Sequence, residues 1–324
     1  MRDSGGQVNP WPARLHVVTG KGGTGKTSVA AALALALAAG GRRTLLVEVE
    51  GRQGVAQLFE TPPLPYEERR IAVAPGGGEV FALAVDPELA LLEYLDMFYR
   101  LGAAGRALRK VGAIDFATTI APGMRDVLVT GKVKEATTRA VDGRRVYSAV
   151  VLDAPPTGRI GRFLNVTAET ARLAKVGPIK SQSEGVAALL RSAMTSVHVV
   201  TLLEEMPVQE TLDAIADLGT LGIPVGRVIV NGTRPPLLAG AAKVTQAELR
   251  RGLAAAGLPT DRATVAGLHA ETKDYLTRRA LEESLRADLA ELGRPMVELP
   301  LLPDGVDRAG LDTLAGTLAH PDPT

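Results

Sequence analysis

The segment GKGGTGKT, residues 20–27, has the residue types and spacing of a loop that binds the phosphates of a nucleotide. It matches the pattern G-x-x-x-x-G-K-[ST], which Gly20 begins and Lys26 and Thr27 end. Glycines let backbone N–H groups turn toward an anion, the lysine reaches the β- and γ-phosphates, and the threonine hydroxyl binds Mg²⁺. The candidate nucleotide-binding residues of this stretch are Gly20, Gly22, Gly23, Thr24, Gly25, Lys26, Thr27 and Ser28.

The stretches on either side are the elements that such a loop needs. Residues 15–19 form a short apolar run that predicts a strand, and the Ala- and Leu-rich stretch after the loop predicts a helix that ends at Gly40 and Gly41. The N-terminus of that helix adds a positive dipole end to the loop. The alternative is a glycine-rich turn that only caps a helix.

Further along the chain, apolar runs alternate with helical stretches. Helices are predicted at 208–221 and 272–292, among others. Strands are predicted at 44–50, 79–86, 147–155, 196–204, 226–232 and 296–300. Uninterrupted apolar strands that alternate with helices predict a mostly parallel sheet with helices on both faces. We therefore expect an α/β fold of the P-loop NTPase class.

The domain organisation follows from the same pattern. We expect a disordered N-terminus over residues 1–13 and a single domain over residues 14–324. Two stretches without a good strand pattern, at about 87–142 and 160–195, predict helical insertions into this domain.

The composition excludes several kinds of chemistry and partner. The 324 residues include no cysteine, which excludes disulfides, thiolate metal sites and thiol nucleophiles. The net charge of +1 gives no strong attraction to nucleic acid, so no nucleic-acid partner is expected. The longest apolar run, residues 29–39, is too short to cross a bilayer, and the first residues lack a secretory pattern. We expect a cytoplasmic protein without a transmembrane segment.

Lys21 directly follows the first glycine, although one lysine suffices for a phosphate site. With Lys21, the loop resembles the deviant Walker A motif of the arsenite-pump and tail-anchored-protein-targeting ATPases, the ArsA-like family. In the wider class of these ATPases, the extra lysine contacts the nucleotide of the facing subunit. The resemblance therefore implies catalytic roles for Lys21 and Lys26, and a homodimer or a heterodimer with a related ATPase subunit. The alternative for Lys21 is a solvated loop charge.

The segment LLVEVEGRQGVAQLF, residues 45–59, resembles switch I of that family. There an aspartate closes the strand and positions the attacking water, whereas this chain has Glu50. Glutamate is longer by one methylene, about 1.5 Å, and a misplacement of about 1 Å in a catalytic group can cost on the order of a hundredfold in rate. The resemblance implies a catalytic Glu50 that acts as a base in slow hydrolysis. A solvated loop glutamate is the alternative.

The segment VVLDAPPTGRIGRFL, residues 150–164, resembles switch II. An aspartate at the end of an apolar strand is costly unless it is paired or near a metal. The resemblance implies that Asp153 is catalytic and holds Mg²⁺ through water, with Thr27 as the other metal residue, and that Gly158 senses the γ-phosphate. ATP and Mg²⁺ are thus the implied ligands. A strand-end aspartate that caps a turn is the alternative.

Two later stretches resemble the adenine-binding part of the family site. VIVNG ends a predicted strand at Asn231, which in the family reads the adenine edge. ELPLLPDGVDRAG, residues 298–310, resembles the loop that covers the ring, with Pro300 and Leu301 as the candidate residues. Asn-Gly after a strand is also an ordinary turn. The stretch PVQETLDAIADLGTLGIP, residues 207–224, resembles the family helix that leads into the strand of Asn231.

The resemblance covers nearly the whole chain from residue 14 and is closest to actinobacterial members of the family. The absence of cysteine excludes a thiolate metalloid site and a cysteine-bound zinc clamp between subunits. The chain has only six methionines, whereas targeting members bind a client helix in a methionine-rich groove. The apolar stretch LALLEYLDMFYRLG, residues 89–102, is typical of core packing. A groove for a hydrophobic or membrane-protein client is the alternative.

Two functions are compatible with these residues. The first is an ATP-hydrolysing dimeric switch that couples the nucleotide state to the binding of a client or partner. The second, suggested by Glu50, is a nucleotide-gated scaffold subunit with weak or no hydrolysis, paired with a related ATPase.

Overall fold

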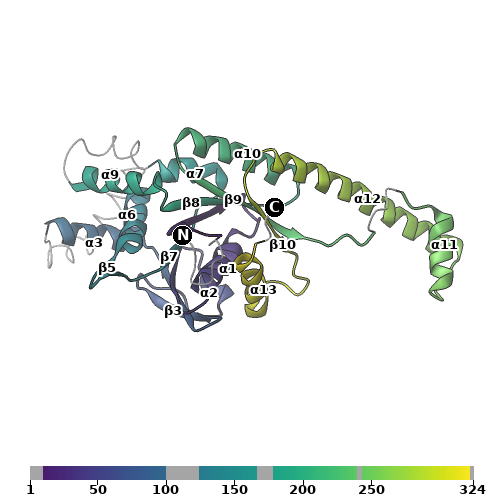
Figure 1. The fold of residues 1–324 in the computed structure, drawn as a ribbon, viewed down its shortest axis with the longest axis horizontal. Coiled ribbons are helices and arrows are strands. Elements are labelled where there is room, and N and C mark those ends of the chain that lie inside the picture. The colour runs from purple at the N-terminus through teal and green to yellow at the C-terminus, as the bar shows by residue number, and fades with distance from the viewer. Residues whose placement is uncertain (1–9, 100–123, 166–177, 239–242, 322–324) are drawn as a thin grey trace.

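The computed structural model describes residues 10–99, 124–165, 178–238 and 243–321, and its centre is an eight-stranded sheet (Figure 1). The strand order is β10-β9-β8-β1-β7-β2-β4-β3, and every neighbouring pair is parallel except β3 with β4. The strands are β1 Leu15–Gly20, β2 Arg43–Glu48, β3 Arg69–Ala74, β4 Gly78–Ala84, β7 Ala149–Asp153, β8 Thr195–Thr201, β9 Val225–Thr233 and β10 Met296–Pro300. The predicted α/β fold with a mostly parallel sheet is confirmed.

Helices cover both faces of the sheet (Figure 1). They are α1 Lys26–Ala38, α2 Gly54–Leu58, α3 Pro87–Tyr99, α6 Met124–Thr138, α7 Thr157–Leu164, α9 Pro178–Leu190, α10 Glu205–Thr220, α11 Gln246–Ala255, α12 Arg262–Ala290 and α13 Arg308–Ala319. Alternate strand residues face opposite sides. Val18 and Leu46 belong to the core with α1 and α13, whereas Val17 and Leu45 belong to the core with α6 and α7.

Helix α1 is apolar on all sides because it is packed on all sides. Every residue from Val29 to Ala38 is buried, between the sheet and α13. Six of these ten residues are alanines, which allow close approach to the strands. The helix that follows the phosphate loop therefore has little freedom to move.

The chain is packed from residue 10 onward, earlier than the predicted disordered segment 1–13 implies. Trp11 and Ala13 are buried, and Trp11 Nε1 donates a 2.7 Å hydrogen bond to the Leu318 carbonyl in the last turn of α13. Residues 1–9 lie outside the described residues.

The two predicted insertions are helical where the structure describes them. The first contains α3 and α6 and ends in a hairpin of two short strands, β5 Ala140–Val141 and β6 Arg144–Arg145. The second contains the end of α7 and all of α9. Residues 100–123 and 166–177 lie outside the described residues, and so do the side chains of Leu95 to Tyr99 in the proposed client groove.

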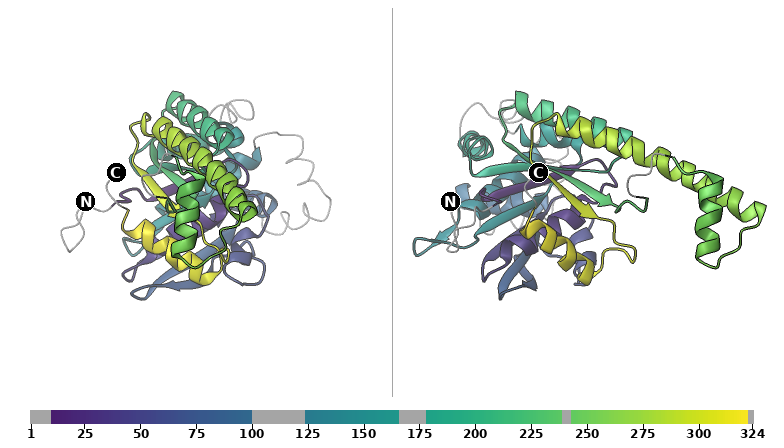
Figure 2. Two further views of the ribbon diagram at one scale, coloured as in Figure 1. Left: turned by 90° about the vertical axis from the view of Figure 1, so that its right-hand side faces the viewer. Right: turned by 45° about the vertical axis from the view of Figure 1, so that its right-hand side comes forward.

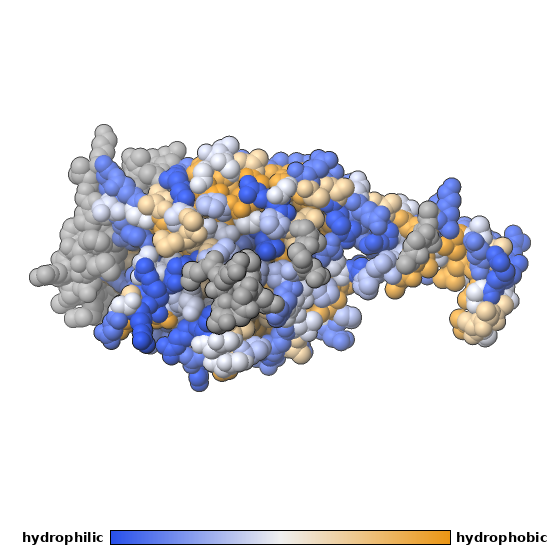
Figure 3. Space-filling model, in the orientation of Figure 1, coloured by the Kyte–Doolittle hydropathy of each residue, from blue (hydrophilic) through white to orange (hydrophobic). Residues whose placement is uncertain are grey.

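Two helices form an arm that extends from the sheet (Figure 2). Helix α12 begins at Arg262, ten residues before the predicted start at residue 272, because the Asp261 carboxylate caps its N-terminus. Helix α11 begins with a capping box between Thr245 and Glu248 and contains no buried residue. Apolar side chains are visible along this arm in Figure 3. None of the helices in the described ranges is long and apolar enough to span a membrane.

Candidate nucleotide-binding site

The phosphate loop lies between the end of β1 and the start of α1, and two of its glycines occupy conformations that other residues avoid. Gly23 and Gly25 have φ of +91° and +86°, in the left-handed region. A Cβ at Gly20 would lie 2.3 Å from the Val200 carbonyl oxygen of β8. The Thr24 hydroxyl donates to the Lys21 carbonyl at 2.9 Å and closes the loop on itself. The glycines therefore shape this loop, while Gly22 has no neighbour within 4 Å of such a Cβ.

The first turn of α1 is open to an anion. Gly25 at its N-cap provides no side-chain cap, and the first turn, which holds Lys26, Thr27 and Ser28, contains no acidic residue. Within the described residues, the Lys26 ammonium has no hydrogen bond or ion pair. Uncapped N–H groups and an unpaired ammonium favour a bound phosphate.

Thr27 and Asp153 meet at the edge where the parallel strands end. The Thr27 hydroxyl donates a 2.7 Å hydrogen bond to Asp153 Oδ2. The other carboxylate oxygen, Oδ1, is buried without a hydrogen-bond partner. An unpaired buried carboxylate oxygen is costly, and a hydrated cation would satisfy it. The hydroxyl and the carboxylate are the hard oxygen donors that suit Mg²⁺.

The environment of Asp153 disfavours its negative charge. Burial raises the pKa of Asp153 to about 6, and the charges of Glu48 and Glu50 act in the same direction. The Thr27 hydrogen bond and the Lys26 charge oppose this increase. A cation at this position would relieve the excess of negative charge.

Glu48 is a residue of this site that the sequence reasoning missed. It ends β2 directly beside Asp153 in the parallel register, and only 3% of it is exposed. Its carboxylate accepts hydrogen bonds from the Gly54 and Val55 N–H groups at 3.2 and 3.4 Å. Glu48 thus fixes the start of α2 in the switch I segment. A glutamate that directly follows the apolar residues 45–47 of the predicted strand was the signal in the sequence.

Glu50 is largely buried and lies on the same side of the site. Its side chain is 18% exposed, and its Oε2 lies 3.9 Å from Arg52 Nε. Its charge contributes to the raised pKa of Asp153, so the two carboxylates are near each other. This position differs from that of a solvated loop glutamate, but its catalytic role stays a prediction.

Lys21 is bound within its own chain. Its ammonium donates to a carboxylate oxygen of Glu210 on α10, and the Thr157 hydroxyl donates to the other oxygen at 2.9 Å. The lysine is therefore not a free loop charge in this structure. Gly158, the next residue of α7, is exposed, and no atom lies within 4 Å of a Cβ built on it.

The predicted adenine residues lie at the same edge of the sheet. Asn231 Nδ2 donates to the Thr24 carbonyl at 2.9 Å, so this side chain supports the phosphate loop. Pro300 ends β10, and the next residue, Leu301, is 43% exposed and donates its N–H to the Thr233 carbonyl at 2.8 Å. Contact of any of the three with adenine stays a prediction.

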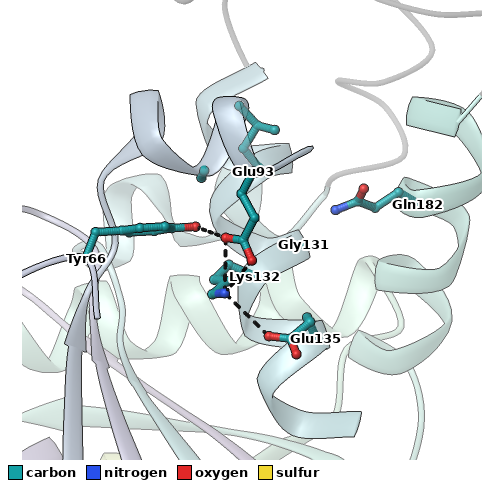
Figure 4. A pocket seen from close by; sticks show the side chains of 8 residues that line it. Tyr66, Glu93, Gly131, Lys132, Glu135 and Gln182 are labelled. Carbon is teal, nitrogen blue, oxygen red and sulfur yellow. Dashed lines mark hydrogen bonds and ion pairs between the residues drawn. The ribbon is translucent and has the colours of Figure 1, made fainter. Parts of the chain in front are cut away.

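A second polar cluster lies away from this edge, in a small cavity between α3, α6 and α9 (Figure 4). Glu93 accepts hydrogen bonds from the Tyr66 hydroxyl and from Lys132 Nζ, the latter at 2.8 Å. Lys132 also lies 3.6 Å from Glu135. Tyr66, Glu93, Lys132 and Glu135 pair with one another, which indicates a structural role in joining α3 to α6.

A parallel sheet with a glycine loop before a buried helix, and a Thr–Asp pair at the same edge, defines a P-loop nucleotide-binding protein. The family model described as Anion-transporting ATPase, ArsA_ATPase, matches residues 13–194. The chain belongs to the ArsA ATPase family.

Individual relatives agree with this assignment. ATPase BagA of Mycobacterium tuberculosis is 54% identical over 98% of this chain and 97% of its own length. The Arsenical pump-driving ATPase of Escherichia coli is 27% identical over 75% of this chain and 45% of its own length. The predicted resemblance to the ArsA-like family and to its actinobacterial members is confirmed.

Proposed function

We propose that the protein is an ATP-hydrolysing dimeric molecular switch. The Thr27–Asp153 pair is the observation that carries this proposal, because a hydrated Mg²⁺ would satisfy its unpartnered Oδ1. The unpaired Lys26 beside the open start of α1 supports the same site.

The chain's own residues would hold Mg²⁺ by the Thr27 hydroxyl and, through water, by the Asp153 carboxylate. Such an ion would supply positive charge that stabilises the charge on the phosphate oxygens. Thr27 would then turn its hydroxyl from Asp153 Oδ2 toward the ion. Lys26 would bind the β- and γ-phosphates with the N–H groups of residues 22–27.

Glu50 is the proposed group that orients the attacking water and accepts its proton. Its longer side chain would make hydrolysis slow relative to an aspartate in the same position. Glu48 is a poorer candidate for this role because its carboxylate already binds the N–H groups of Gly54 and Val55.

The dimeric state and the client are also part of this proposal. Lys21 would contact the nucleotide of a facing subunit, either a second copy or a related ATPase. The nucleotide state would control the binding of a hydrophobic or membrane-protein client in the cytoplasm. Because the chain has no cysteine, a metalloid carried on thiolates is not the client.

Calorimetric titration with ATP and Mg²⁺ tests the binding site. Lys26→Ala should abolish binding, and an unchanged affinity would refute the site. A control, Lys273→Ala, removes a lysine of α12 on the arm and should bind as the wild type does.

The second candidate function is a nucleotide-gated scaffold subunit with little hydrolysis, and Glu50 is the observation that favours it. Steady-state phosphate release from the wild type and from Glu50→Asp separates the two functions. A large gain in Glu50→Asp supports the scaffold subunit. Equal rates in the two proteins remove its basis.

A further inference from the structure

Glu210 on α10 binds two different parts of the nucleotide site at once. One carboxylate oxygen accepts the Lys21 ammonium of the phosphate loop. The other accepts the Thr157 hydroxyl at 2.9 Å, and Thr157 is the first residue of α7 in the switch II segment. One side chain therefore joins the phosphate loop to switch II.

The element that carries Glu210 is firmly packed. Helix α10 contacts α7, β8 and β1, and its buried face includes Val208, Thr211 and Leu218. Glu210 lies at the edge of this face, and its side chain is 32% exposed. Thr157 is buried, whereas the Lys21 side chain is 31% exposed. The carboxylate is thus held in place by the packing of α10, and it binds a lysine expected to contact a facing subunit and a threonine next to the γ-phosphate sensor Gly158.

The two bonds hold the lysine and the helix in a single arrangement. Lys21 cannot keep this contact within its own chain and also extend across an interface to another subunit. Movement of the first turn of α7 toward a γ-phosphate would likewise separate Thr157 from Glu210. A ligand that draws either residue away must therefore break a bond to Glu210.

We propose that Glu210 is a positioning residue that stabilises the arrangement of Lys21 and α7 seen in this structure, and that it releases both when a γ-phosphate binds. This inference rests on the proposed ATP-binding function and adds a residue that sets the preference for triphosphate over diphosphate. Lys21 and Thr157 lower the pKa of Glu210, so the carboxylate is ionised at neutral pH and its pairing with Lys21 is intact there.

Calorimetric titrations with ADP and with a non-hydrolysable ATP analogue, both with Mg²⁺, test the proposal. Glu210→Gln and Glu210→Ala should bind the analogue about three- to tenfold more tightly than the wild type, as expected for loss of a half-exposed charged hydrogen bond. Affinity for ADP should stay the same, because ADP lacks the phosphate that displaces the two residues. Glu205→Gln removes the same charge from an exposed position of α10 and should change neither affinity.

Thr157 provides an independent test. Thr157→Val removes one of the two bonds and should give a smaller gain for the analogue, whereas Thr157→Ser should behave as the wild type. In the Glu210→Ala background, Thr157→Val should add nothing, because the acceptor is already absent.

The possible results separate the failure of this proposal from that of the proposed function. If folded Glu210 variants keep the wild-type ratio of analogue to ADP affinity, Glu210 has only a structural role. Circular dichroism shows whether the Glu210 variants are folded. If they are not, the proposal is overturned by a Thr157→Val variant that keeps the wild-type ratio of analogue to ADP affinity. If the wild type binds neither nucleotide, the proposed function itself fails, and the role of Glu210 fails with it.

Discussion

The Thr27 hydroxyl donates a 2.7 Å hydrogen bond to Asp153 Oδ2 and joins the first turn of α1 to the end of β7. The two residues are 126 positions apart in the chain, yet parallel strands bring them to one edge of the sheet. The buried, unpartnered Oδ1 makes this pair incomplete within the described residues. A cation bound at this pair would provide the partner that Oδ1 lacks.

Asp153→Asn tests this relationship. The variant should lose the effect of Mg²⁺ on ATP affinity, because the amide cannot replace the carboxylate in holding the hydrated ion. Without ligands it should be about 1 kcal/mol more stable, since a buried charge without full pairing is removed. Titrations with and without EDTA and urea unfolding measure the two effects. A variant that keeps the full dependence on Mg²⁺ would contradict the assigned role.

Gly25→Ala should distort the phosphate loop. Gly25 has φ +86°, and an added Cβ would lie 2.4 Å from Asn231 Nδ2. We expect a loss of about 1–3 kcal/mol in unfolding free energy and weaker ATP binding. Gly22→Ala is the matched control, because its Cβ would have no neighbour within 4 Å; its stability should change by less than about 1 kcal/mol. Equal destabilisation by the two substitutions would mean that the loop geometry is wrong.

Two buried histidines make the fold sensitive to acid. The backbone N–H of Arg227 donates to His198 Nδ1 at 3.1 Å, so the proton of this imidazole is on Nε2. His198 Nε2–H then donates to His16 Nδ1 at 3.1 Å. His16 Nε2–H then donates to the Ala13 carbonyl at 3.0 Å. Both imidazoles are therefore neutral, with one tautomer each, and every ring nitrogen is used.

The free energy of unfolding should fall as the pH falls from 6.5 to about 4, because the two buried histidines resist protonation in the folded chain. Burial lowers the pKa of His16 from 6.5 to about 4, and burial also lowers that of His198. A histidine whose pKa is lower in the folded chain than in the unfolded chain contributes its full stability at a pH above the unfolded pKa. That contribution is lost as the pH falls toward the folded pKa. For His16 alone the loss between pH 6.5 and 4 is about 3 kcal/mol. Urea unfolding across this range measures it.

His16→Asn should make that pH dependence shallower, whereas His320→Gln removes an exposed histidine and should leave it unchanged. A wild-type stability that stays constant from pH 7 to 4.5 would exclude the neutral pair.

Helix α11 should be the least protected of the described helices. It has ten residues, none of them buried, and isolated helices of this length are marginal in water. Its amides should exchange with solvent much faster than those of α1, where ten consecutive residues are buried. Thr245→Ala should remove the capping box and cost about 1 kcal/mol of local stability. Exchange in α11 as slow as in α1 would show that this arm is stabilised in another way.

Much of the fold could be predicted because most strands of the sheet are short apolar runs in the sequence. Strand β7 is an apolar run that ends in Asp153, and the loop before α1 contains Gly23 and Gly25, whose positive φ values favour glycine. Strand β3 was missed because it is an exposed edge strand that begins with two arginines. Helix α11 was missed although Thr245 and Glu248 form a capping box, since its apolar residues do not form a buried face.

The site could be predicted only in part. Local motifs were enough to propose Lys26, Thr27 and Asp153, and the structure brings Thr27 and Asp153 together. The contacts of Lys21, in contrast, depend on a residue nearly two hundred positions away. Helical spacing places Glu210 beside the buried residues of α10, yet nothing in the sequence says that it faces the phosphate loop. Pairings of this kind come from tertiary packing.

Calorimetric titration of the purified chain with ATP and Mg²⁺, alone and with a related subunit, tests the central claim most directly. The account predicts saturable binding in the wild type that Lys26→Ala abolishes and that EDTA weakens. No measurable binding of ATP in either condition, or the same affinity in Lys26→Ala, would contradict it.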